Sequence, residues 1–563
     1  MTRQPEPTGF SFKDASLPPT LKSSSLLIFV VPAIVGLLLM IPVTLKNSAT
    51  YDEVAYARIA CEWYRGEPTS EITRMGSPVS FWKVQSLPGL LLLDALGRDE
   101  LIQDPLKNLP RLLVWLRFSA LWCWLVAIGA TQGWALWQSG RKAAWLCGFL
   151  FALGPNFMAH ASLITMEMPL TAFWTLALLS FQAYTKNRRF SFLLAAGIFA
   201  GMAFSMKFTG FLLPFLMAAF VFFDCLLKKQ KLLGSLLESL TIVVLCGSLL
   251  IATNLVMTGF ETIRLSEQSG RHPWLENRFP PGLAAFLSQV LETNFPVDWV
   301  GFITQMRHQS SGGPSYLLGK ISSQGWWYYY PVTIAVKVPL VILLLMVIRV
   351  LKTFYRASAG LELIPFVCLV FLVLACAGSK RNYGFRYLLP LAPMMMVWFS
   401  SLFDGKRRAV WGLLAVVALA IETSATYPYP LVFFNRMAGG TNGGRLILAD
   451  SNLDWGQGLI SLREIQKDMP ELNDLTLYYF GDADPTAYGI RGTTFKIDAS
   501  DNFDQLPEKP ENTETQFVGI STSLLNGPWG PPGYFREMMW HKPLHTTSDW
   551  SIQIFRVSKM DHH

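Results

Sequence analysis

The sequence predicts a polytopic α-helical membrane protein of about eleven transmembrane helices, followed by a C-terminal extracytoplasmic α/β domain. Hydrophobic residues make up 51% of the 563 residues and charged residues only 15%, and the mean hydropathy is +0.33. This composition lies outside the range of soluble globular proteins. The net charge of +8 does not indicate a nucleic-acid partner, because the Lys and Arg residues fall mainly in short gaps between apolar runs, where they set orientation.

The apolar runs have lengths compatible with the ~20 residues that cross a hydrocarbon core. They lie near residues 25–45, 112–137, 143–159, 165–184, 191–206, 208–227, 232–257, 328–349, 361–378, 387–403 and 409–426. The first run is too long for a cleavable signal region, so we expect it to remain as the first helix. Residues 1–24 are then an N-terminal cytoplasmic tail, and residues 25–426 form the transmembrane domain.

Basic gaps between the runs predict the orientation. They lie at 140–142, 186–189, 228–231, 349–356 and 406–408, all on one side of the membrane if every run spans it. The positive-inside rule assigns that side to the cytoplasm. The long polar segments 46–111, 258–327 and 427–563 are then extracytoplasmic, so we expect an integral, multi-pass protein of the inner (cytoplasmic) membrane whose active site faces outward.

Residues 427–563 have a different pattern from the rest of the chain. Short β-rich runs at 445–448, 475–480, 517–520 and 550–557 are separated by a helical stretch, 457–467, and by Pro and Gly turns. This mixture is typical of a small α/β domain.

Two adjacent acids, Asp52 and Glu53, follow the first apolar run. Thr50 and Glu53 have the spacing of a capping box, and a helix dipole would favour Asp52 in the first turn. For Glu53 this structural explanation is as good as a catalytic one. The capping box uses Glu53 and does not require Asp52. Asp52 is therefore the better candidate for a base that takes the proton of an attacking hydroxyl.

Further charges are predicted at the membrane boundary or within spans. Glu167 lies at the outer end of the run 165–184, where a carboxylate in apolar surroundings is costly, although a first-turn acid would also satisfy the helix dipole. The cations Lys207, Lys337 and Arg386 lie at or within predicted spans. They either extend toward lipid headgroups or, if they converge, form a site for a phosphate or diphosphate.

Other conspicuous residues have simpler explanations. Trp326 begins an aromatic run, 326–330, that fits an interfacial belt better than a sugar platform. His308 is a lone loop histidine without the spacing of a zinc site, and Asp482 with Asp484 lacks a full set of calcium ligands. Segment 450–457 is rich in turn and cap residues, which indicates a strand-to-helix connection.

The order and sidedness of several segments resemble one enzyme group. These are the pair Asp52-Glu53, the start of the fourth helix at Glu167, the segment around Lys207, the stretch 314–330, and Asn382 to Pro390. Together they resemble the membrane glycosyltransferases of the GT-C superfamily, specifically the family 39-like group of protein O-mannosyltransferases and lipid A aminoarabinose transferases. Segments 427–440, 450–457 and 479–490 resemble a bacterial branch of this group with an extra C-terminal domain.

The resemblance implies a GT-C type fold and a specific reaction. A hexosyl or pentosyl unit passes, with inversion, from a polyprenyl-phosphate carrier to a protein, lipid or polysaccharide on the outer face. Asp52 would be the base, while Glu53 and Glu167 would orient donor or acceptor. Independently of the resemblance, we expect that no cofactor is required; a divalent cation is possible, but the ligand spacing does not support one.

Two further sets of residues are candidates for binding, and for Lys207 and Arg386 the resemblance itself implies contact with the leaving phosphate. The donor phosphate would be bound by Lys207, Arg386 and Lys337. Candidate substrate contacts are His308, Trp326 and Tyr387. One departure is that many relatives begin the fourth helix with an aspartate where this chain has Glu167, which is one methylene longer but can accept the same hydrogen bonds.

Two other classes of function remain open from the sequence. A transporter or lipid flippase would also carry charges in its spans, but deeper and within an inverted repeat. A membrane-anchored binding protein would act through its C-terminal part, with the acids serving only as helix caps.

Overall fold

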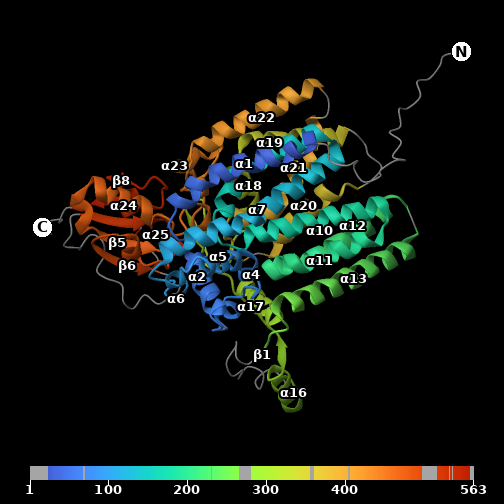
Figure 1. The fold of residues 1–563 in the computed structure, drawn as a ribbon, viewed down its shortest axis with the longest axis horizontal. Coiled ribbons are helices and arrows are strands. Elements are labelled where there is room, and N and C mark those ends of the chain that lie inside the picture. Colours follow the sequence, from blue (N-terminus) through green and yellow to red (C-terminus); the bar gives the residue numbers. More distant parts are fainter. Residues whose placement is uncertain are drawn as a thin grey trace.

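The computed structural model describes residues 23–67, 70–229, 231–264, 280–355, 361–378, 380–403, 406–497, 517–531, 533–535 and 537–557. Most of these residues are helical, and a small sheet lies at one end of the helical bundle (Figure 1). Residues 1–22 of the predicted cytoplasmic tail lie outside the described residues, and Ser23 already begins the first helix.

The apolar runs form the helices of the bundle. These are α1 (Ser23–Lys46), α7 (Leu109–Ser139), α8 (Arg141–Leu153), α10 (Glu167–Asn187), α11 (Phe190–Met206), α12 (Leu213–Leu227), α13 (Leu232–Thr258), α18 (Tyr329–Lys337), α19 (Leu340–Tyr355), α20 (Leu363–Gly378), α21 (Ala392–Ser400) and α22 (Lys406–Ser424). Among the described residues, four stretches are long and apolar enough to cross a membrane, or five if α18 and α19 count as one bent span. The chain is therefore a polytopic helical membrane protein, and the number eleven stays a prediction.

Two of the predicted spans are interrupted. The run 143–159 ends as a helix at Leu153, and a short helix, α9 (Pro155–Ala161), follows it. The run 328–349 is bent by 116° between α18 and α19, because Pro339 removes a backbone donor and disfavours helical geometry at the residue before it. The two breaks contact each other, because Asn156 Nδ2 of α9 donates to the backbone carbonyl of Lys337 at 2.8 Å.

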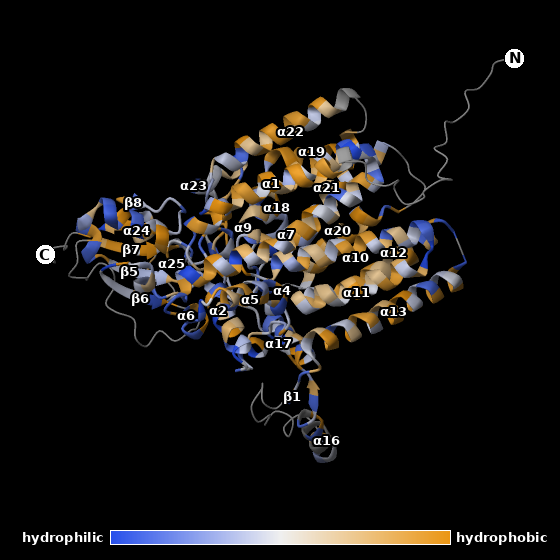
Figure 2. Cartoon of the chain, viewed as in Figure 1, coloured by the Kyte–Doolittle hydropathy of each residue, from blue (hydrophilic) through white to orange (hydrophobic). Residues whose placement is uncertain are grey.

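Helix α13 packs closely against α11 on one side and exposes apolar side chains on the other. Gly197 and Gly201 of α11 face α13 so closely that an added Cβ would lie 3.1 Å and 3.0 Å from the Cα atoms of Cys246 and Leu250, which is the use of small residues expected between membrane helices. Other side chains of α13, such as Leu233 and Leu240, are exposed. Figure 2 shows hydrophobic residues along the whole length of these helices, as expected of surfaces that contact lipid.

The first predicted outer segment folds into short helices. They are α2 (Tyr51–Tyr64), α3 (Glu71–Arg74), α4 (Phe81–Gln85), α5 (Leu87–Ala95) and α6 (Asp99–Gln103). The second segment contains two antiparallel strand pairs, β1 (Thr262–Arg264) with β2 (Asn294–Pro296) and the hairpin of β3 (Ser315–Leu317) with β4 (Lys320–Ser322). Its helices are α16 (Pro281–Leu291), which lies between β1 and β2 in the sequence, and α17 (Val297–Ser311).

The C-terminal segment contains a five-stranded mixed sheet in the order β6-β5-β7-β9-β8. Its strands are β5 (Thr476–Phe480), β6 (Thr493–Ile497), β7 (Phe517–Ser521), β8 (His545–Thr546) and β9 (Ile552–Arg556). Strand β5 is parallel to β6 and β7, while β9 is antiparallel to β7 and β8. The helices α24 (Leu459–Asp468) and α25 (Thr522–Leu525) and several turns complete the segment.

The predicted strands and helix of this segment are mostly found, with one error. Runs 475–480 and 550–557 contain β5 and β9, run 517–520 contains all but the last residue of β7, and the helical stretch 457–467 contains most of α24. Run 445–448 is not a strand: it continues the turn after α23 (Gly440–Gly444). Its carbonyl groups accept hydrogen bonds from the β3 hairpin instead, from Tyr316 Oη to Leu446 and from the Leu318 N–H to Ile447.

Candidate active site

Four charged side chains from distant parts of the chain converge next to the outer polar segments. Arg386 Nη1 lies 2.9 Å from Asp52 Oδ2 and 3.9 Å from Glu167 Oε1. Lys207 Nζ donates to the same Glu167 Oε1 at 2.9 Å. Two acids and two cations therefore form one connected network.

Asp52 is presented by the first turn of α2. The backbone N–H of Thr50 donates to Glu53 Oε2 at 3.0 Å, so Glu53 closes the helix cap. Its carboxylate also forms a buried ion pair with Arg117 of α7, at 2.5 Å from Oε2 to Nη2, and Oε1 accepts the N–H of Ile164 at 3.0 Å. This geometry agrees with the capping explanation for Glu53 and fixes Asp52, the next residue toward the N-terminus, in place.

Lys207 and Arg386 are held by aromatic rings. Lys207 ends α11 with an extended backbone, and its Nζ lies 4.1 Å from the centre of the Tyr387 ring. The Arg386 guanidinium lies 4.3 Å from the centre of the Trp455 ring. Cations over aromatic faces are attracted by the ring quadrupole, so both side chains are oriented before any ligand binds.

Asp52 and Arg386 line a polar cavity of about 480 Å³, a volume within the range of small-molecule sites. Its walls come from the first outer segment, the end of α17 and the residues after it, the segment before η2 (Phe385–Leu391), and the C-terminal segment. The C-terminal part supplies four lining residues: Asp450, Trp455, Phe480 and Trp529. The C-terminal segment is thus part of the cavity wall.

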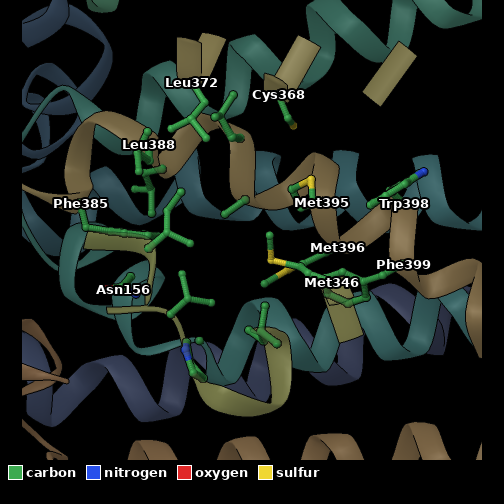
Figure 3. A pocket seen from close by; sticks show the side chains of 18 of the residues that line it. Asn156, Met346, Cys368, Leu372, Phe385, Leu388, Met395, Met396, Trp398 and Phe399 are labelled. Carbon is green, nitrogen blue, oxygen red and sulfur yellow. The ribbon is translucent and has the colours of Figure 1, made fainter. Parts of the chain in front are cut away.

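A second, almost wholly apolar groove of about 350 Å³ lies beside the network. It runs between α9, the bend from α18 to α19, α20, η2 and α21. Figure 3 shows Leu388, Met346, Met396 and Phe399 converging on it. Phe385, one of its lining residues, directly precedes Arg386 in the chain, so the groove and the charged network adjoin.

Lys337 is not in the charged network. It is buried at the end of α18, where its Nζ donates to the carbonyl oxygens of Leu431 (2.8 Å) and Asn452 (2.7 Å) and lies 4.5 Å from the centre of the Phe434 ring. With its donors used in this way, the side chain joins α18 to the C-terminal segment. The phosphate contact expected for Lys337 stays a prediction.

The three candidate substrate contacts occupy different places. Tyr387 lies in the network beneath Lys207. Trp326 and His308 do not line the polar cavity. The backbone N–H of Trp326 donates to Asn382 Oδ1 at 2.7 Å. Burial, together with the nearby charge of Arg381, lowers the pKa of His308.

Several residues of the site were not predicted as functional. Arg117 lies inside a predicted span and was not singled out, although a charge there is itself a signal. Asp450 and Trp455 were assigned to a connection, and Phe480 and Trp529 carry no local motif. Only the density of polar residues in segment 450–457 could have drawn attention to this region.

No group of three or more His, Cys, Asp or Glu residues that could hold a metal ion occurs in the part of the chain that the structure describes. Asp482 and Asp484, considered above for calcium, have other partners. Lys496 Nζ donates to the Asp482 carbonyl at 2.9 Å, and Asp484 accepts the N–H of Thr486 at 2.9 Å.

One segment of the chain matches the model of a known protein family. Residues 112–248, about a quarter of the chain, match the model of the dolichyl-phosphate-mannose-protein mannosyltransferase family. This segment contains Arg117, Glu167 and Lys207. Over these residues the chain is similar to protein mannosyltransferases, in agreement with the resemblance seen in the sequence. No curated protein matches the chain.

Two solved structures are similar over most of the chain. ArnT from Cupriavidus metallidurans, bound to undecaprenyl phosphate, has 14% identity over 96% of this chain and 98% of its own, with a TM-score of 0.49. AglB, an oligosaccharyltransferase from Archaeoglobus fulgidus in complex with an inhibitory peptide and a dolichol-phosphate, has 13% identity over 88% and 69%, with a TM-score of 0.46. Both TM-scores lie below 0.5, so these likenesses define neither the fold nor the function of this chain.

Proposed function

We propose that the protein is an inverting glycosyltransferase that moves a sugar from a polyprenyl-phosphate carrier to a hydroxyl acceptor on the extracytoplasmic face of the inner membrane. The observation that carries the proposal is the Asp52–Arg386–Glu167–Lys207 network, placed between a polar cavity and an apolar groove. A lipid-linked sugar phosphate needs these three environments together: cations for the phosphate, an apolar surface for the chain and a polar space for the sugar.

The reaction balances with Asp52 as the base. The acceptor oxygen attacks the anomeric carbon, its proton passes to the Asp52 carboxylate, and the bond from the anomeric carbon to the phosphate oxygen breaks. The electron pair leaves with polyprenyl phosphate, which gains negative charge. Arg386 and Lys207 stabilise that charge in surroundings that are largely shielded from water, where preorganised charges are most effective.

The second acid of the network has a different role in this proposal. Glu167 is only 3% exposed. Its Oε1 receives Lys207, whereas Oε2 has no hydrogen-bond partner among the described residues. A buried carboxylate oxygen without a donor is costly, so we assign Oε2 to a hydroxyl of the bound sugar. Glu53, whose two oxygens both have protein donors, supports α2 instead.

A transfer assay in membranes tests the function. Membranes containing the protein receive labelled undecaprenyl-phosphate-linked hexoses and pentoses, and label that leaves the carrier for an endogenous acceptor is measured against membranes lacking the chain. We expect covalent transfer of at least one sugar that depends on the protein. Label that crosses the membrane while still attached to its carrier would instead indicate a flippase and would contradict the proposal.

Lys207→Met is expected to weaken binding of undecaprenyl phosphate by about ten-fold or more. A hydrogen bond to a charged group contributes about 1.5–3 kcal/mol, and each 1.4 kcal/mol corresponds to about ten-fold in affinity. The measurement is thermal stabilisation of the purified protein by increasing undecaprenyl phosphate. Lys142→Met, an exposed lysine at the start of α8, is the matched control and should bind like wild type; equal binding by both variants would remove Lys207 from the phosphate site.

The pH dependence of transfer should have an acidic limb above about pH 4. Only the carboxylate form of Asp52 accepts a proton, so activity is lost as pH falls through its pKa. Burial raises the pKa of Asp52 above the ordinary value of ~3.9, an effect that Arg386 beside it reduces without cancelling. The check is kcat/KM against pH, with thermal stability followed over the same range to exclude unfolding. A limb below pH 4 would contradict the assignment.

A further inference from the structure

A second carboxylate faces the polar cavity from the C-terminal segment. Asp450 lines the cavity together with Asp52 and Arg386, although it lies far from both in the sequence. Its backbone is in the left-handed region, with φ = +56°, a conformation that is uncommon for residues other than glycine. Strained backbone of this kind concentrates at functional sites, so the position of Asp450 calls for an explanation beyond a simple turn.

The loop that carries Asp450 is fixed on several sides. The Phe385 N–H donates to Asn452 Oδ1 at 2.9 Å, and Ser451 Oγ donates to the carbonyl of Tyr383. The buried Lys337 donates to the Asn452 carbonyl at 2.7 Å. These bonds attach Tyr383 and Phe385, which precede Arg386, to the residues that follow Asp450. The loop therefore holds Asp450 at a defined place in the cavity wall.

Asp450 differs in charge from Arg386 and Lys207, the two cations assigned to the donor phosphate, and forms no ion pair with either of them among the described residues. Among the described residues, the ion pairs of Arg386 are with Asp52 and Glu167, and Asp450 is not within ion-pair distance of it. Burial raises the pKa of Asp450, and the charge of Arg386 lowers it. A carboxylate repels a phosphate, but it is a strong acceptor for a neutral hydroxyl.

We propose that Asp450 is a substrate-contacting residue that accepts a hydrogen bond from a hydroxyl group of the acceptor and thereby positions the acceptor beside Asp52. The inference rests on the proposed glycosyl transfer and extends it to the C-terminal segment. The acceptor then lies between Asp52 and the wall formed by Phe480 and Trp529, whose rings stack at 5.5 Å, and the donor phosphate lies on the side of Lys207.

The test uses Asp450→Asn and Asp450→Gly in the full-length protein. Glycine, and to a smaller extent asparagine, adopt positive φ readily, so both variants remove the negative charge and keep the backbone. The control Asp484→Asn removes an exposed carboxylate from a turn in the same segment and should behave as wild type. Endogenous acceptor, extracted from cells that lack the chain, is titrated at saturating donor.

We expect both Asp450 variants to raise the KM for acceptor about ten- to a hundred-fold, the loss typical of a hydrogen bond to a charged group, with a much smaller change in kcat. The ratio of sugar transferred to acceptor over sugar released to water should fall in parallel. A fall in kcat with KM unchanged, or no change in either, would overturn the inference while leaving the proposed function intact. If wild-type protein transfers no sugar, the proposed function itself fails, and this inference fails with it.

Discussion

Asp52→Asn is expected to lower the rate of sugar transfer by about 10²- to 10⁴-fold, the usual contribution of a general base, while the protein still folds and binds undecaprenyl phosphate. The asparagine has nearly the shape of the aspartate but cannot take a proton. The loss should appear in kcat, because the attack on the anomeric carbon is the step that needs the base.

The control for this variant is Asp99→Asn, which removes an exposed first-turn acid from α6 in the same outer segment. It should transfer sugar at the wild-type rate. Wild-type transfer by Asp52→Asn, with Glu53 and Glu167 intact, would mean that another group is the base. Loss of undecaprenyl phosphate binding in Asp52→Asn would instead assign the residue to the placement of Arg386, with which it forms an ion pair at 2.9 Å.

Arg117→Met should destabilise the protein by about 3–5 kcal/mol, the cost of leaving a buried charge without its partner. Arg117 is 2% exposed and Glu53 is fully buried. The guanidinium also donates to the carbonyl oxygens of Thr44, Asn47 and Ser48, which form the connection from α1 to the active-site helix. The variant should therefore unfold at a lower temperature in detergent and lose activity on heating earlier than wild type.

Two further variants separate charge from packing at Arg117. Arg111→Met replaces an exposed arginine in the first turn of the same helix and should unfold at the wild-type temperature. Adding Glu53→Gln to Arg117→Met removes the unpaired charge and should recover part of the stability, but not all of it, because the three carbonyl groups remain without their donor. No recovery would show that the carbonyl contacts dominate.

The sequence predicted the helices of the bundle and the four charges of the network because each has a local signal. Apolar runs of sufficient length define the helices, and a charge at the edge of such a run is costly enough to indicate a role. The break at Pro339 was also readable, since proline disfavours helical geometry at the preceding residue, yet the strength of the apolar pattern on both sides predicted one continuous span.

The remaining parts of the site depend on contacts between distant residues, which a single sequence does not reveal. Asp450 has no nearby residue that marks it as different from any other turn acid, and its importance follows from its place in the wall of the cavity that Asp52 and Arg386 also line. For Lys337 the local sequence gives a signal, but the contacts in the structure differ from what it suggests. A lysine in an apolar run suggests a ligand, whereas its three-dimensional partners are two backbone carbonyls. Run 445–448 has the composition of a strand, but its N–H groups donate to the carbonyl oxygens of Thr441, Gly443 and Gly444 in the preceding turn and not to a strand of the sheet.

The backbone bonds between the start of α2 and the C-terminal segment have a consequence for biosynthesis. The N–H of Tyr51 donates to the Trp455 carbonyl at 2.8 Å, and the N–H of Ser48 donates to the Gln457 carbonyl at 3.0 Å. Because the chain is synthesised from its N-terminus, residues 48–51 are made long before residues 455–457, to which they bond. Residues 48–51 can form these bonds only after residues 455–457 have been synthesised, so this part of the site is completed late in the synthesis of the chain.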